Sequence, residues 1–377
     1  MKLIHTADTH LGGEFALHDM QKAQARKNEL RAAFSSLIYW AKTENADLFL
    51  ITGDLFDSPY PTPDTVDFVL TQLRLIPNCR VIITPGEHDY LAEDGVYNTV
   101  TFPENVTIFK KSKLSACRFT TKDGQAITVL GYGFTTPILP TNPFAGLSLE
   151  PSDEIRIIAC HGELEKENSK LCPITLGEIR ESRADYIALG HAHRSSGIKK
   201  IDNTYFGYAG SLEGWNFRDL GERGAYKLEI TKSEGVATCR PAFFRLSKRI
   251  YATETLDLSG KIGQNAILST ITERLKSKGY GSDTLLRLTL TGEVLPEAEL
   301  TTKALAEALS TLYYCEIVDH TVPKFDLAVF KKDPTVKGEL VRTLLPLLES
   351  ENEEERLYAS RALKYALIAL AGGELGD

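Results

Sequence analysis

Histidine and aspartate gather in five short motifs, each at the end of an apolar run. A strand that stops at a glycine beside a charged or imidazole side chain presents that side chain instead of burying it. The motifs are Asp8-Thr9-His10, Gly53-Asp54, Gly86-Glu87-His88-Asp89, His161-Gly162 and Gly190-His191-Ala192-His193. Five such strand ends in one chain indicate one shared site, which we predict to hold two metal ions.

The types of side chain in these motifs define the chemistry. Carboxylates and neutral imidazoles without thiolates favour manganese, zinc or iron. Asp8 and His10 have i, i+2 spacing, which places both on one side of a strand end. Asp54 follows Gly53, where a small neighbour lets two ions approach, and its two oxygens can bridge them. A metal pair about 3.5–4 Å apart polarises a phosphoryl group, so the motifs predict two-metal phosphoryl chemistry.

Each motif taken alone has a plainer interpretation. Asp8 and Asp54 could cap helices, and Glu87 could be a surface turn residue. A lone histidine at a strand end is usually structural. These interpretations require five independent coincidences in one chain, so the shared metal site is the stronger hypothesis.

The segments around the motifs alternate between predicted strands and helices. Buried strands are predicted at Lys2–Asp8, Asp47–Asp54 and Arg80–Thr84. Helical spacing of apolar residues begins at Leu30 after a polar stretch, and Asp64 is the predicted N-cap of a second helix. Further strands are predicted at Asn105–Phe109, Ala126–Phe134, Arg156–Cys160, Tyr186–Leu189, Thr204–Tyr208 and Gly224–Ile230. This order predicts a layered α/β sandwich with helices outside two sheets.

The pattern changes near Pro241, where strands and helices begin to alternate again. We predict three parts: a metal-site domain at 1–240, a small α+β domain at 241–334 and a helical tail at 335–377. The second part has strands at Phe243–Leu258, Leu285–Thr291 and Tyr314–Thr321, and helices at Ile262–Lys278 and Glu297–Leu312. The tail has two amphipathic helices, Gly338–Leu348 and Glu353–Leu370.

Composition excludes several classes of protein. The net charge of −8 gives no global positive field, which argues against a purely electrostatic DNA-coating protein. The six cysteines form no CxxC pair, as expected of reduced thiols. The chain runs from Met1 directly into a strand, and no apolar run nears the ~20 residues of a membrane span. We therefore expect a cytoplasmic protein without a membrane partner.

The motif series D-x-H, G-D, G-x-H-D, H-G and G-H-x-H resembles that of the calcineurin-like metallophosphoesterases. Four segments also resemble the SbcD-type DNA repair exonucleases: Thr6–Gly12, Ile51–Asp57, Ala188–His193 and Tyr208–Glu213. The resemblance implies a four-layer α/β/β/α metallophosphoesterase sandwich, a small α+β DNA-capping domain and a helical C-terminal tail. It also implies a DNA exonuclease subunit that acts in double-strand-break repair.

The resemblance assigns a role to each motif residue. Asp8, His10 and His193 would hold the first ion, and Asp54 would bridge. His161 and His191, with residue 87, would hold the second ion. His88 would act at the scissile phosphate, and Asp89 would accept its ring N–H. Two divalent ions, expected to be manganese, are the implied cofactors.

One residue departs from the family pattern. The family usually has Asn at the position of Glu87. With Asp8 and Asp54, two divalent ions leave a formal charge of about +2, which Glu87 lowers to about +1. Glu87 is therefore expected to hold the second metal more tightly and to attract phosphate less, unless it swings away and leaves that site weak.

The substrate and partners follow mainly from the resemblance. DNA is the expected substrate, and an SMC-like ABC ATPase of SbcC type is the expected partner, clasped by the tail; a homodimer is also expected. Candidate DNA contacts are Lys22, Arg26, Lys27, Trp215 and Arg218. Two alternatives remain: a small-molecule phosphodiesterase or phosphatase on the same fold, and a catalytically weak adaptor for the ATPase.

Overall fold

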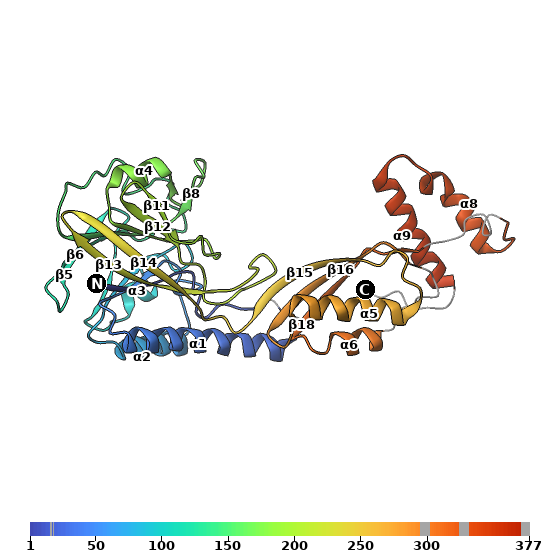
Figure 1. Ribbon diagram of the computed structural model, residues 1–377, viewed down its shortest axis with the longest axis horizontal. Helices are drawn as coiled ribbons and strands as arrows, with labels where there is room; N and C mark the ends of the chain where they lie inside the picture. The colour runs from blue at the N-terminus through green and yellow to red at the C-terminus, as the bar shows by residue number, and fades with distance from the viewer. Residues whose placement is uncertain (16, 18, 295–301, 324–331, 371–377) are drawn as a thin grey trace. The chain divides into compact units, whose positions relative to one another are not determined.

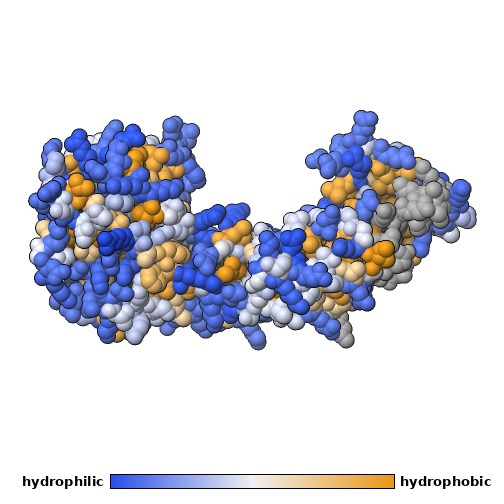
Figure 2. All heavy atoms as spheres, viewed as in Figure 1, coloured by the Kyte–Doolittle hydropathy of each residue, from blue (hydrophilic) through white to orange (hydrophobic). Residues whose placement is uncertain are grey.

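The computed structural model describes residues 1–15, 17, 19–294, 302–323 and 332–370 (Figure 1). Its contacts divide the chain into two compact units, Met1–Ile250 and Tyr251–Asp377. The predicted domain boundary at residue 240 falls inside a strand of the first unit, and the tail helices lie in the second unit. On the face drawn in Figure 2, hydrophilic residues predominate over the surface of the first unit.

The first unit contains two six-stranded sheets. The first sheet has the order β14-β13-β1-β2-β3-β4. Its strands are β1 (Lys2–Thr6), β2 (Leu48–Thr52), β3 (Arg80–Thr84), β4 (Val106–Ile108), β13 (Gly224–Ser233) and β14 (Val236–Arg245). Strands β1 to β4 are parallel, and β13 and β14 are antiparallel neighbours. The carboxyl ends of β1 to β4 therefore lie at one edge.

The second sheet has the order β11-β12-β10-β7-β6-β5. Its strands are β5 (Ser115–Thr120), β6 (Ala126–Gly131), β7 (Ile155–His161), β10 (Tyr186–Gly190), β11 (Lys199–Ile201) and β12 (Thr204–Tyr208). The four central strands are parallel. Strand β5 was not predicted, because its side chains alternate between half-buried and exposed and give only a weak apolar signal.

Period-two alternation in the strands builds the layers. In β2, Leu48 and Leu50 face the core between the two sheets, whereas Phe49 and Ile51 face the helices. The outer face of the first sheet is covered by α1 (Met20–Thr43) and α2 (Pro63–Arg74), and α4 (Leu176–Ser182) covers the second. The predicted four-layer sandwich is confirmed. Short elements complete the unit: α3 (Val96–Thr99), β8 (Glu163–Leu164) and β9 (Pro173–Ile174).

The starts of the two long helices differ from the prediction. Helix α1 begins at Met20, within the stretch interpreted as polar, because the Asp19 carboxylate accepts hydrogen bonds from two backbone N–H groups of its first turn. Helix α2 is capped by Thr62, with Pro63 as its first residue, so Asp64 is not the N-cap.

His5 lies in the core with its two ring nitrogens 2.7 Å from Tyr186 Oη and 2.9 Å from Thr52 Oγ1. Burial lowers its pKa from 6.5 to about 3. Its neutral form is favoured in the fold, so the unfolded chain binds the extra proton below pH 6.5. Stability that is complete above that pH is lost on acidification, at about 1.4 kcal/mol per pH unit, until the folded pKa is reached.

We therefore expect His5→Gln to flatten the pH dependence of the free energy of unfolding between pH 6.5 and about 3. Urea unfolding at several pH values measures this slope. Carboxylates contribute equally in both proteins, so the difference reports His5. Parallel curves for the two proteins would contradict a neutral, buried His5.

The second unit is built around a three-stranded sheet of order β15-β16-β18. Its elements are β15 (Ile250–Asp257), α5 (Gly263–Lys278), β16 (Thr284–Thr291), β17 (Glu293–Val294), α6 (Thr302–Leu309), β18 (Tyr314–Asp319), β19 (Val322–Pro323), α8 (Val336–Leu348) and α9 (Glu353–Leu370). Helices α5 and α6 pack on one face of the sheet. The predicted strand at 243–258 is two strands separated by residues 246–249, and the start of the predicted helix at 297–312 lies outside the described residues.

The described helices include none long and apolar enough to cross a membrane. The cysteines of the chain are free thiols, as predicted.

Candidate metal centre

All five motifs lie at carboxyl ends of parallel strands. The Asp8–His10, Gly53-Asp54 and Gly86–Asp89 motifs follow β1, β2 and β3 of the first sheet. His161 ends β7 and Gly190 ends β10 of the second sheet. Hydrogen bonds join the two edges, among them one in which the His161 ring Nδ1 lies 2.9 Å from Thr52 O and one in which the His191 N–H donates to Asp8 Oδ1 over 2.9 Å. The topology therefore brings the motifs together.

The backbone is left-handed at four of the motif residues. The φ angles are 50° at Asp8, 48° at His10, 51° at Asp54 and 105° at His191. Residues other than glycine seldom adopt positive φ, and such residues cluster at functional sites. Here the turn at each strand end directs the side chain toward the common centre.

Glycines beside the motifs leave room for the side chains of predicted ligands to lie against the backbone. A Cβ on Gly53 would lie 1.8 Å from His161 Nδ1, and one on Gly86 would lie 2.2 Å from Asp54 Oδ1. We expected Gly53 to make room for metal ions. The structure shows that Gly53 makes room for the imidazole of His161, which is the ring of a predicted ligand.

The predicted ligands of the first ion lie together. Ligand atoms of Asp8, His10 and Asp54 lie within 4.8 Å of one another, and all three residues are buried. His10 Nε2 lies 3.2 Å from His193 Nε2 and 3.7 Å from Asp54 Oδ2. The carboxylates of Asp8 and Asp54 thus share one site with the imidazole of His10, and the imidazole of His193 adjoins this site through its contact with His10.

The predicted ligands of the second ion form a neighbouring group. Ligand atoms of Glu87, His161 and His191 also lie within 4.8 Å of one another. His161 Nε2 lies 3.6 Å from Asp54 Oδ2, so Asp54 borders both groups. Glu87 contacts both rings, with Oε1 2.7 Å from His191 Nδ1 and Oε2 in direct contact with His161 Nε2. Glu87 is therefore turned into the site.

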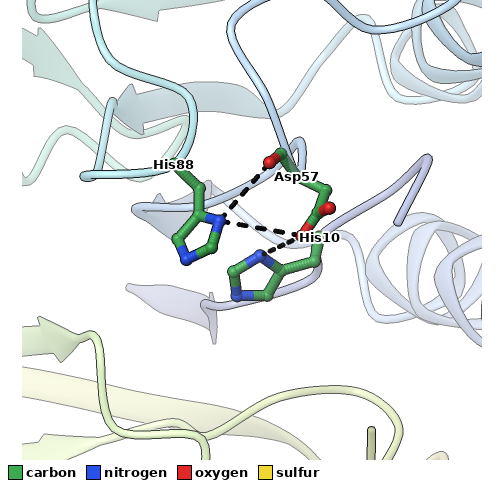
Figure 3. Close-up of side chains that lie close together, drawn as sticks. All are labelled: His10, Asp57 and His88. Carbon is green, nitrogen blue, oxygen red and sulfur yellow. Dashed lines mark hydrogen bonds and ion pairs between the residues drawn. The ribbon is translucent and has the colours of Figure 1, made fainter. Parts of the chain in front are cut away.

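His88 and Asp57 form a third group with His10 (Figure 3). Both rings turn a nitrogen toward Asp57, whose Oδ1 lies 3.1 Å from His10 Nδ1 and 3.7 Å from His88 Nδ1. The His88 side chain is 48% exposed, and its backbone N–H donates to Asp54 Oδ1. His88 is thus held at the centre while its ring remains open to a substrate.

The prediction that Asp89 accepts the His88 ring N–H is wrong. Asp89 is fully buried, and its carboxylate accepts hydrogen bonds from the N–H groups of Gly86 and Phe56 and from the Tyr97 hydroxyl. These bonds use the carboxylate to fix the loop that carries His88. Asp57 is the carboxylate nearest the ring.

Three functional candidates were missed from the sequence. Asp57 lies three residues after Asp54 on the same loop, and this spacing was the available signal. Asp219 Oδ1 lies 3.5 Å from His193 Nδ1, and Glu163 Oε1 lies 3.3 Å from His191 Nε2. Each of these carboxylates orients an imidazole by its second nitrogen, as partners of metal-binding histidines do.

The electrostatics of the centre reflect several buried carboxylates. Burial raises the pKa of Asp54 well above its usual range, and the charges of Glu87, Asp89 and Asp8 raise it further, against the opposing effect of His161. Burial also acts to raise the pKa of Glu87, but the two imidazoles that it contacts outweigh burial and hold its pKa well below the usual value.

The pKa values of two imidazoles, His161 and His10, are shifted in opposite directions. Burial acts to lower the pKa of His161, but the carboxylates of Glu87, Asp54 and Asp8 outweigh it and raise the pKa well above 6.5. At His10 burial dominates and lowers the pKa. Neutral imidazole is the form that binds metals. The buried carboxylates need positive charge, which either protonated imidazoles or cations supply.

The donor set fits divalent cations. It consists of carboxylate oxygens and imidazole nitrogens without a thiolate. Glu87 Oε2 and His161 Nε2 are buried and make no hydrogen bond within the described residues, although they contact each other. With His161 neutral, this carboxylate oxygen and this imidazole nitrogen would both be ligand atoms for one divalent cation.

The predicted contact of Arg26 with DNA is wrong in this structure. Arg26 is fully buried, and its guanidinium donates to Glu29, Glu213 and the Gly214 carbonyl over 2.9–3.0 Å. Its charge is neutralised inside the first unit. Burial could not be foreseen because its main partner, Glu213, lies 187 residues away in the sequence.

The other candidate DNA contacts stay predictions. Lys22 and Lys27 are at the surface, but each lies beside a carboxylate, 3.7 Å from Asp19 and 3.2 Å from Glu14. Trp215 stacks on Phe15 with ring centroids 4.3 Å apart, which explains its position by packing. Arg218 is exposed on the same loop as Trp215.

Replacement of Glu87 by Asn tests the role that we predict for this carboxylate in the second ion site. Loss of the Glu87 carboxylate removes its charged contacts with His161 and His191. We therefore expect the second cation to bind about 10–100-fold more weakly. The more positive centre should lower KM for a phosphodiester at saturating metal. Calorimetric titration with Mn²⁺ and diester kinetics measure the two effects.

Glu87→Gln is the matched control, because it removes the charge and keeps the length. Gln and Asn variants that both resemble the wild type in metal affinity and rate would contradict any role for Glu87.

Comparison with known proteins identifies the family. The sequence pattern of the calcineurin-like phosphoesterases matches residues 1–195, more than half of the chain. The protein belongs to this family of metal-dependent hydrolases, whose members use a two-metal centre.

Individual relatives are distant. The uncharacterized metallophosphoesterase YhaO of Bacillus subtilis is 25% identical over 300 residues, which cover 78% of this chain and 72% of YhaO. The DNA double-strand break repair protein Mre11 of Archaeoglobus fulgidus is 23% identical over 412 aligned positions, covering 100% of this chain and 86% of that protein. Mre11 of Methanopyrus kandleri is 25% identical, and the match spans 52% of its length.

Solved structures give a weaker likeness. A dimetal phosphatase from Danio rerio has a TM-score of 0.38 at 10% identity, over 66% of this chain and 99% of that one. Vps29 of Entamoeba histolytica with zinc has a TM-score of 0.31 at 13% identity, over 65% of this chain and 100% of that one.

Proposed function

We propose that the protein is a two-metal phosphodiesterase that cuts DNA, the nuclease subunit of a double-strand-break repair complex of SbcD type. The observation that carries the proposal is the convergence of seven predicted ligands beside an open histidine: Asp8, His10, Asp54, Glu87, His161, His191 and His193, with His88. The Mre11 relatives, named for double-strand break repair, favour DNA as the substrate.

The proposed mechanism assigns each residue a task. Asp8, His10 and His193 would hold one ion, and His161, His191 and Glu87 would hold the other; the Asp54 carboxylate borders both groups of side chains. The chemistry that two bound divalent ions would supply here is polarisation of the phosphodiester and a lowered pKa of water. Asp57 holds the ring of His88 by its Nδ1, which leaves Nε2 to give a proton to the leaving oxygen.

The test is Mn²⁺-dependent cleavage of an end-labelled linear duplex, with Asp54→Ala as the matched inactive protein. Asp54 borders both predicted ion sites, so its loss should abolish cleavage. Equal cleavage by the two proteins would contradict the proposal, because the activity would then not depend on the predicted ion sites. If the intact chain hydrolyses only a chromogenic diester, even with the ATPase present, the small-molecule phosphodiesterase is the better assignment. Bound metal without any turnover would favour the adaptor.

The tail helices support a docking role. Helix α8 packs against α9, where Val341, Ala359 and Leu363 are buried. Large apolar side chains nevertheless stay exposed along the pair, among them Tyr358 at 72% and Tyr365 at 48%. Surface of this kind suits a helical partner, and we propose the coiled coil of an SMC-like ABC ATPase.

Two changes test the docking proposal. Truncation after Pro334 removes both helices and should abolish co-purification with the ATPase while the diester activity of the first unit remains. Tyr358→Ser with Tyr365→Ser changes only exposed side chains and should weaken association by at least about tenfold. Aggregation of the truncated chain, together with unchanged binding by the double variant, would favour helices that only pack on their own unit.

A further inference from the structure

A run of lysines follows β4 at the edge of the sheet that carries the metal centre. Lys110, Lys111 and Lys113 lie between β4 and β5. Strand β4 is parallel to β3 and pairs Ile108 with Ile83, so the loop leaves the sheet beside the segment that leads to Glu87. This basic loop was not singled out in the sequence.

The basic loop is held to the walls of the site by backbone hydrogen bonds. The Phe109 N–H donates to Ile83 O over 3.0 Å, and the Gly133 N–H donates to Lys111 O over 2.9 Å. The next residue, Phe134, donates to Pro85 O over 3.1 Å. The loop is therefore fixed relative to the segment that carries the predicted ligands.

The three lysines differ from the basic residues near the first motif. All three are exposed, and their ammonium groups make no ion pair or hydrogen bond with any described residue; the Ser115 hydroxyl donates only to the backbone carbonyl of Lys113. Lys22 and Lys27 are offset by carboxylates, and Arg26 is buried. In a chain of net charge −8, the basic loop is a local concentration of unneutralised positive charge.

The distance between the basic loop and the metal centre would let one long polyanion contact both. Asp54 follows β2, and β3 and β4 are the next strands across the sheet. At about 4.8 Å per strand, the loop begins about 10 Å from the centre. Successive base pairs of duplex DNA rise by about 3.4 Å, so the lysines would meet phosphates about three nucleotides from the scissile bond.

We propose that Lys110, Lys111 and Lys113 are the phosphate-contact surface that guides duplex DNA to the metal centre. This inference rests on the proposed function and names the surface by which that site takes its substrate. A small phosphodiester is too short to reach from the centre to the loop, so the loop would select for a long substrate.

The experiment compares two triple variants of equal charge. Lys110→Gln/Lys111→Gln/Lys113→Gln neutralises the basic loop. Lys42→Gln/Arg74→Gln/Lys122→Gln removes three exposed charges that lie where the chain turns toward the amino ends of β2, β3 and β6, at the opposite edge. Binding of a fluorescent linear duplex is followed by anisotropy with a chelator present, over a range of salt concentrations. Thermal unfolding checks that each variant is folded.

We expect the basic-loop variant to bind duplex at least about tenfold more weakly at low salt and to reduce the slope of log Kobs against log salt by about 2–3. The control variant should match the wild type. Equal binding by the two variants would overturn the inference even if the wild type cuts DNA.

Hydrolysis of a chromogenic diester by the wild type tests the metal centre separately. Duplex binding that depends on the loop, without any hydrolysis, would keep the inference and refute the proposed function. No measurable duplex binding by the wild type would overturn the inference, and diester hydrolysis would then leave a phosphodiesterase with a small substrate.

Discussion

His88→Ala is expected to lower the rate of Mn²⁺-dependent DNA cleavage by about 10²–10⁴-fold, the usual contribution of a general acid. The ring has its Nδ1 against Asp57, is 48% exposed and borders His10 at a centroid distance of 4.6 Å. It is not among the predicted ligands, so the amount of bound Mn²⁺ should be unchanged. Single-turnover kinetics and metal analysis of the same preparation measure the two quantities.

The leaving group distinguishes general acid catalysis from a loss of structure. A nitrophenolate leaves without help from a proton, whereas the alkoxide of DNA needs one. His88→Ala should therefore lower the rate much less for a nitrophenyl diester than for DNA. Equal losses on the two substrates, or a loss of bound metal, would contradict the proton-donor role and assign His88 to holding the site together.

Gly53→Ala is expected to cost several kcal/mol in the free energy of unfolding and to destroy the second ion site. The added Cβ would lie 1.8 Å from His161 Nδ1, and the residue has a φ of +92°. His161 would have to leave the position in which it contacts Glu87. Urea unfolding and Mn²⁺ titration give the two measurements.

Gly124→Ala separates backbone strain from the steric clash. Gly124 has a similar φ of +85°, but nothing lies within 4 Å of its would-be Cβ. We expect this control to lose about 1 kcal/mol and to keep both metal sites. Losses of equal size at the two positions would show that the contact with His161 contributes nothing.

The sequence predicted the frame of the site because the relevant signals are local. The strands at Arg80–Thr84 and Thr204–Tyr208 have the predicted bounds, since each is an apolar run closed by glycine or proline. The convergence of the five motifs follows from one rule, that carboxyl ends of parallel strands share an edge. The strand bounds and the shared edge do not depend on which side chains from distant parts of the sequence contact each other.

The predictions from the sequence that are wrong concern contacts between segments that are distant along the chain. The burial of Arg26 depends on Glu213, which the fold brings from 187 residues away. The carboxylate of Asp89 turns into the core because Tyr97 and the N–H groups of Phe56 and Gly86 offer three donors there. The ring of His88 therefore has Asp57 as its nearest carboxylate. Neither partner can be read from spacing along the chain, because Asp57 lies 31 residues from His88 whereas Glu87 and Asp89 adjoin it in the sequence.

The left-handed backbone at Asp8, His10 and Asp54 restricts how the centre can be altered. Aspartate, asparagine, histidine and glycine tolerate this conformation, whereas bulky or β-branched side chains do not. Attempts to convert the centre to a softer metal by cysteine at these positions would meet a conformational penalty before any metal bound. Glu87 is not among the residues with positive φ. Position 87 can therefore accept another ligand, such as Asn, without the conformational penalty that applies at Asp8, His10 and Asp54.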